Sequence, residues 1–141
     1  MKPIFEYCNQ LSSINEYLSI SKIKQVKKVL DPPEDGCTTE DIADWLDSYN
    51  IEKQEFHFGP GRQNPPKKGK LHYIIGPYRS GNPIEYWVSL RNHWGQNVVM
   101  KPKDESFVSA GDGQKKVSFS DAVKAAKLML ETPDKKIKFN L

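Results

Sequence analysis

The sequence predicts an α+β fold in which N-terminal helices pack on a small, mostly antiparallel sheet. Three observations support this class. The first fifty residues carry apolar side chains at helical spacing, the middle of the chain contains short β-type runs between Gly- and Pro-containing turns, and an Ala- and Leu-rich segment follows near the end. Helices first, then strands joined by turns, then one helix is the order expected of an α+β domain.

Two helices are expected before the sheet. Over residues 8–29, apolar side chains recur three and four positions apart, with a break expected near residues 19–21. A second helix is expected to begin at Thr38 or Thr39 and to stop near Asn50. Thr38 and Asp41 have the spacing of a capping box, although Asp stands where Glu or Gln is usual.

The rest of the chain is expected to form short strands and a last helix. Gly76 and Pro77 are expected to end a strand, and Asp112 with Gly113 to form a turn. The last helix is expected over residues 121–130, capped by Ser118 or Ser120. The expected strands cover residues 54–58, 71–75, 86–90 and 98–101.

Length and composition indicate one globular domain, residues 1–141, with a lysine-rich C-terminal tail from about residue 131. The net charge of +3 is small, and we interpret the lysine clusters as solvated faces, so nucleic acid is not an expected partner. The sequence contains no apolar run of signal-peptide or membrane-span length. We therefore expect a soluble protein without membrane contact, either cytoplasmic or delivered to a target cell without a cleavable signal peptide.

The two cysteines do not form a Cys-x-x-Cys pair, which argues against a disulfide framework and a structural zinc site. No cofactor or metal is expected. A thiol at a helix start has a lowered pKa, because unpaired N–H groups and the helix dipole favour the anion. Cys8 and Cys37 both precede expected helices, so position alone does not choose between them.

The order of Cys8, His72 and Asn92 favours Cys8 as the reactive thiol. Cys8 precedes a long helix, His72 begins a strand, and Asn92 follows a strand and precedes Trp94 and Gly95. The run from Tyr86-Trp87 to Asn92-His93-Trp94-Gly95 resembles a motif of papain-like cysteine peptidases, Tyr-Trp followed by Asn-Ser-Trp-Gly. The chain also resembles minimal papain-like domains such as bacteriocin-leader peptidases and papain-fold toxins or effectors.

This resemblance implies a Cys-His-Asn triad. Cys8 would be the nucleophile, His72 the base and acid, Asn92 the residue that orients His72, and Trp94 the shield over their hydrogen bond. The implied function is a thiol hydrolase that acts on a protein or peptide substrate, as a cysteine peptidase or as an amidase or deamidase.

The chain departs from the papain pattern around the nucleophile. No Gln precedes Cys8 to donate to the oxyanion, and Gln10, the candidate supporting residue, follows the cysteine instead. In addition, His93 stands where the family has Ser. These departures motivate the alternative of a non-catalytic protein-interaction module, such as an inhibitor or immunity-type protein, on the same or another α+β fold.

Overall fold

The fold was analysed in a computed structural model, which describes residues 28–56, 64–78, 85–110 and 113–140. The expected helix over residues 8–29 therefore falls almost wholly outside the described residues. At its end, residues 28–30 are described and are not helical.

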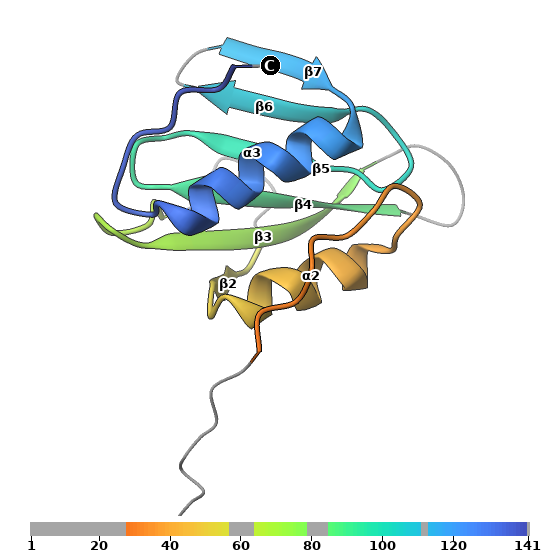
Figure 1. Cartoon of the computed structure of the whole chain (residues 1–141), viewed down its shortest axis with the longest axis horizontal. Coiled ribbons are helices and arrows are strands. Elements are labelled where there is room, and N and C mark those ends of the chain that lie inside the picture. The colour runs from red at the N-terminus through yellow and green to blue at the C-terminus, as the bar shows by residue number, and fades with distance from the viewer. Residues whose placement is uncertain (1–27, 57–63, 79–84, 111–112, 141) are drawn as a thin grey trace, which may run out of the picture.

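The described residues form two helices and a six-stranded, mostly antiparallel sheet, which confirms the α+β class (Figure 1). The helices are α2 (Thr39–Ser48) and α3 (Phe119–Glu131). The strands are β2 (Glu52–Gln54), β3 (Leu71–Tyr78), β4 (Glu85–Asn92), β5 (Asn97–Met100), β6 (Ser106–Ala110) and β7 (Gly113–Val117).

Both helices begin at the caps that the sequence predicts. The Thr38 hydroxyl accepts a hydrogen bond from the backbone N–H of Asp41, and the Asp41 carboxylate accepts one from Thr38 N–H. At α3, the Ser118 hydroxyl accepts from the N–H of Asp121. These bonds satisfy donors that a helix start leaves without an intrahelical partner.

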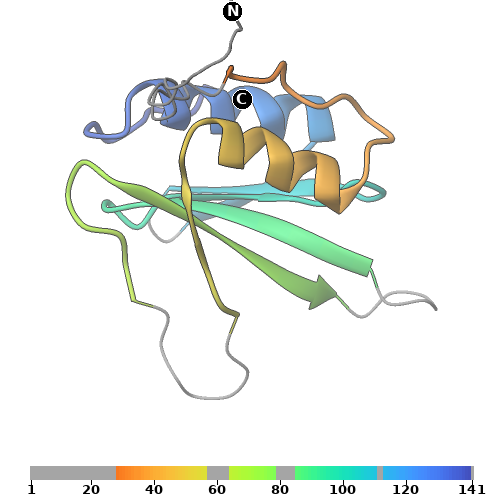
Figure 2. The same ribbon diagram turned by 90° about the horizontal axis from the view of Figure 1, so that it is seen from below.

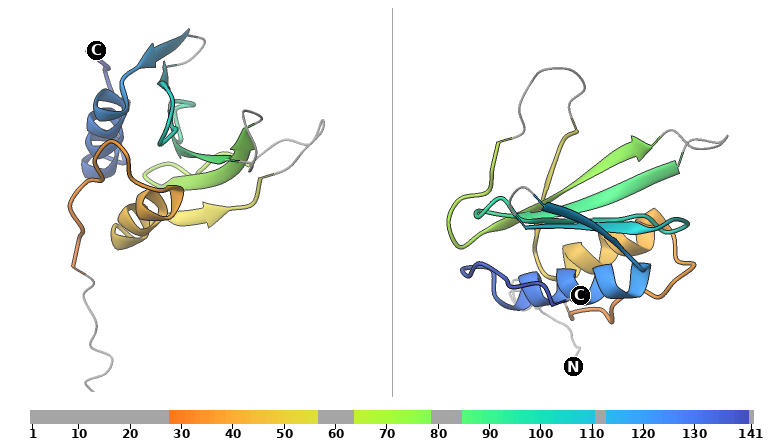
Figure 3. Two further views of the ribbon diagram at one scale, coloured as in Figure 1. Left: turned by 90° about the vertical axis from the view of Figure 1, so that its right-hand side faces the viewer. Right: turned by 90° about the horizontal axis from the view of Figure 1, so that it is seen from above.

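The strands are ordered β2-β3-β4-β5-β6-β7 across the sheet, so neighbours in sequence are neighbours in space. β2 pairs with β3 in parallel, and every other pair is antiparallel. The sheet curves, and α2 and α3 lie side by side on one of its faces (Figures 2 and 3). Among the described residues, no helix covers the other face, which we call the open face.

The hydrophobic core lies between the two helices and the sheet. Alternation along β4 places Val88 and Leu90 in this core, while Ser89 and Arg91 face the opposite side. The helices contribute Trp45 and Met129, which are almost fully buried. The opposite face carries both polar and apolar side chains, and Ile74 and Ser89, which pair there across β3 and β4, are almost fully buried.

The strands differ from the prediction in three places. β2 ends at Gln54, where the expected strand over residues 54–58 begins, and Glu55 and Phe56 are not in a strand. β3 does not end at Gly76 but continues through Pro77, which pairs with Tyr86. Proline is tolerated there because β2 pairs with β3 only as far as Ile74, so one side of β3 has no strand neighbour at Pro77 among the described residues. β6 and β7 were not predicted, and Gly113, which was expected in a turn, is the first residue of β7.

The C-terminal segment is not a free tail. Ile137 is buried in the core, and its backbone N–H and C=O both bond to the side chain of Gln96. Gln96 follows the β4–β5 turn and is 1% exposed. A buried amide thus holds the chain end against the sheet.

Candidate functional site

A row of polar residues crosses the whole open face. Each member is the register partner of the next, and directly paired residues present their side chains on the same face. The row is Glu52, His72, Arg91, Asn97, Ser109 and Gln114, one residue from each of the six strands.

The centre of this row contains two buried polar atoms without a partner. His72 is 3% exposed, and its Nε2 atom has no hydrogen-bond partner. Arg91, its neighbour on β4, is half-buried, and its Nε atom also lacks one. An unpaired buried polar atom costs about 1–3 kcal/mol. Such groups are uncommon in folded proteins, and a bound ligand, ion or water is one way to supply the missing bond.

His72 is held in its neutral form by its surroundings. Burial lowers the pKa of the imidazole below its ordinary value of 6.5, and the positive charge of Arg91 lowers it further. The Glu52 carboxylate acts in the opposite direction and is the smallest of the three influences. Burial also lowers the pKa of Arg91, whose guanidinium nevertheless stays charged.

The lowered His72 pKa predicts a pH-dependent stability. Above the unfolded-state pKa of about 6.5, His72 is neutral in both the folded and the unfolded protein, and its contribution to stability does not change with pH. Below that pH, the unfolded chain binds a proton at His72 more readily than the folded protein does, which favours unfolding. The free energy of unfolding should therefore fall as the pH drops below about 6.5. Urea unfolding of wild type and His72→Gln across pH 5–8 measures this, and equal slopes in the two proteins would contradict it.

The structure does not bring Asn92 to His72. Asn92 pairs with Leu71 and therefore shares the helix-covered face with it, whereas His72 pairs with Arg91 and lies on the open face. The Asn92 side chain is instead committed to the β4–β5 turn. Its Oδ1 accepts from the N–H groups of Trp94 and Gln96, each at 3.0 Å, and its Nδ2 donates to Gln96 Oε1 at 2.9 Å.

Trp94 is placed at the surface of the same turn. It is 40% exposed and packs edge to face on His93, with the ring centroids 5.2 Å apart. There is no His72–Asn92 hydrogen bond for it to shield. Cys8 and Gln10, the other residues assigned to the expected site, lie outside the described residues.

Cys37 is the cysteine that the structure describes. It is half-buried just before the N-cap of α2 and packs against the core. Burial first, and then the Asp41 carboxylate, raise the pKa of its thiol. Cys37 is therefore held in the unreactive protonated form.

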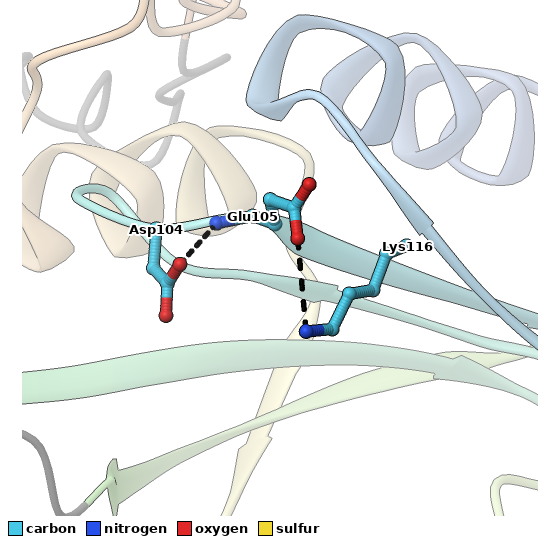
Figure 4. Close-up of polar contacts among 3 residues, drawn as sticks. All are labelled: Asp104, Glu105 and Lys116. Atoms are coloured by element: carbon cyan, nitrogen blue, oxygen red, sulfur yellow. Dashed lines mark hydrogen bonds and ion pairs between the residues drawn. The ribbon is translucent and has the colours of Figure 1, made fainter.

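The open face is cationic toward β6 and β7. Lys101 and Lys116 both lie over the ring of Phe107, with Nζ 4.3 and 5.5 Å from its centroid. Lys116 also reaches Glu105 at 3.6 Å, in an exposed ion pair (Figure 4). Such a pair contributes little to stability, so Lys116 can exchange it for another anion.

The described residues contain no group of three or more His, Cys, Asp or Glu side chains placed to hold a metal ion. Within the same residues, no helix has the length and apolar character needed to cross a membrane.

Two important residues were missed by the interpretation of the sequence. Gln96 gave no signal, because a glutamine after a turn is ordinarily exposed. Arg91 could have been found from the alternation of Val88, Ser89, Leu90 and Arg91, which places an arginine beside a serine on the face opposite the core.

None of the known protein families, curated proteins or solved structures compared with this chain matches it. The resemblance to papain-like peptidases therefore depends on the quoted residues alone.

Proposed function

We propose that this protein is a non-catalytic interaction module that binds an acidic protein segment on the open face of its sheet. The observation that carries the proposal is the pair formed by Arg91 and His72. Both have a buried polar atom without a partner, and the two residues are direct neighbours on that face. A carboxylate is the natural acceptor for a guanidinium N–H.

Charge on the open face supports an acidic partner. Arg91, Lys101 and Lys116 are the cations there, and Phe107 between the two lysines offers an aromatic surface. Of the acidic groups nearby, Glu105 is paired with Lys116, and Glu52, at the β2 edge of the row, keeps its charge while it accepts from Gln54 Nε2 at 2.7 Å. Complementary charge of this kind favours encounter with an acidic surface and disfavours a basic one.

The proposal predicts that a labelled oligoglutamate peptide binds at low salt and that an oligolysine peptide does not. Arg91→Met should weaken oligoglutamate binding about tenfold or more, because it removes a partly desolvated charge from the contact. Lys116→Glu should weaken binding by a smaller factor, as expected of an exposed charge. Fluorescence anisotropy measures both affinities, and the Arg91 Nε–H signal in NMR spectra reports the contact directly in the wild-type protein.

Lys124→Glu is the matched control, since Lys124 is an exposed lysine on α3, on the other side of the sheet. It makes the same charge change as Lys116→Glu but should leave the affinity within about twofold of wild type. Equal effects of the two substitutions would mean that net charge, not the open face, drives binding. An unmoved Arg91 Nε–H signal at saturating peptide would also contradict the proposal.

A second candidate function is the thiol hydrolase that the resemblance implies. The neutral His72 and its unpartnered Nε2 favour it, because a general base needs a free ring nitrogen. Asn92 does not support it, because that side chain serves the turn on the opposite face. Cys8 is the nucleophile this candidate needs, so the reactivity of the Cys8 thiol distinguishes the two functions.

A further inference from the structure

A pocket of about 760 Å³ lies beside the open face, where β2 and β3 begin. The turn from α2 into β2 forms one wall, the returning segment of residues 64–70 forms another, and the end of α3 closes it. This volume is in the range of pockets that bind small molecules.

The walls of the pocket combine apolar and polar surface in similar amounts. Asn50 and Gly69 shape the two turns, since both adopt the left-handed region, with φ of 61° and 79°. The apolar lining residues are Tyr49, Ile51, Pro65, Pro66, Leu71, Leu130 and Pro133.

The cationic groups in the pocket come from Lys67 and Lys70. Both line it, and the N–H of Lys70 donates to Lys67 C=O at 2.9 Å, which closes the turn that carries them. Glu52 is the acidic lining residue among those described, and its carboxylate already accepts a hydrogen bond from Gln54. The lysines therefore outnumber the carboxylate, and the pocket favours an anion.

His72 also lines this pocket, so the unpartnered ring nitrogen that supports binding on the open face supports a ligand here as well. It is 3% exposed and has a ring nitrogen without a partner, although nearly every buried polar atom in a folded protein is hydrogen-bonded. A ligand with an oxygen near His72 would supply the missing bond.

We propose that the pocket binds an organic carboxylate with an apolar body, the carboxylate facing Lys67, Lys70 and His72 and the body lying on the apolar walls. A free carboxylic acid and the C-terminal carboxylate of a peptide present the same chemistry. The pocket does not include Arg91, Lys101 or Lys116, so this proposal goes beyond the acidic segment proposed for the open face.

The test is an NMR titration of the full chain with benzoate, hexanoate, N-acetyl-leucine and N-acetyl-leucine amide. The three carboxylates should shift the His72 ring signals saturably, and the amide should not. A peptide C-terminus is indicated if N-acetyl-leucine binds more tightly than benzoate and hexanoate, and a free acid if the order is reversed. Saturable binding of the amide, or unmoved His72 signals with every carboxylate, would overturn the proposal.

Lysine substitutions locate the site. Lys67→Glu or Lys70→Glu should weaken carboxylate binding about tenfold, because each replaces a charge-assisted contact with repulsion. Lys68→Glu is the matched control, since Lys68 is exposed in the same turn but does not line the pocket, and it should change the affinity less than about twofold. If all three variants lost the same affinity, the cause would be the change in net charge, and the proposed position of the site would be wrong. Arg91→Met should leave carboxylate binding intact, so failure of one proposal is distinguishable from failure of the other.

Discussion

Gln96→Ala is expected to lower the free energy of unfolding by about 3–4 kcal/mol, because it leaves several buried polar groups without partners. Gln96 Oε1 accepts from the backbone N–H of Ile137 at 2.8 Å and from Asn92 Nδ2 at 2.9 Å, while Gln96 Nε2 donates to the Ile137 C=O. Urea unfolding measures the loss. Hydrogen exchange should also show faster exchange at the Ile137 amide.

Gln114→Ala is the control for this substitution. Gln114 is an exposed glutamine on β7, and its truncation should change stability by less than about 0.5 kcal/mol. A Gln96→Ala protein as stable as Gln114→Ala would mean that the buried amide does not hold the C-terminal segment.

Asn92→Ala is expected to lower the free energy of unfolding by about 2–3 kcal/mol. The substitution removes from the β4–β5 turn the Nδ2 donor and the Oδ1 atom, which accepts two hydrogen bonds. The effect should be structural and should not depend on His72. In a double-mutant cycle with His72→Gln, the two losses should therefore add within about 0.5 kcal/mol.

His93→Ala is the matched control, because His93 is exposed in the same turn. It should change stability by less than about 0.5 kcal/mol. A coupling energy above about 1 kcal/mol between Asn92 and His72 would contradict their placement on opposite faces of the sheet.

The helices were predictable because their signals are local. Thr38 with Asp41, and Ser118 before a run of Ala and Leu, mark helix starts through bonds made within one turn. The strands β6 and β7 could not be predicted in the same way. β7 has the sequence Gly-Gln-Lys-Lys-Val, which has little intrinsic preference for a strand. Pairing of β7 with β6, and of β6 with β5, decides their conformation instead.

The candidate site shows why residue order is weaker evidence than register. The prediction placed His72 at the start of one strand and Asn92 just after another; in the structure they lie near the start of β3 and at the end of β4, which are paired. A shift of one residue in register moves a side chain to the other face, and the alternation of apolar residues that sets the register is independent of the order in which motif residues occur. The pairing of His72 with Arg91 decides the site, and it puts Asn92 in the turn and leaves an arginine beside the histidine.

The reactivity of Cys8 is the most direct measure of whether this protein is an interaction module or a thiol hydrolase. A Cys37→Ser variant isolates Cys8, and iodoacetamide is applied at pH 6, where only an activated thiolate reacts quickly. We expect Cys8 to react no faster than a free cysteine model peptide, with the same rate after His72→Gln. Rapid alkylation of Cys8 that slows after His72→Gln would contradict the interaction module and establish a Cys8–His72 pair.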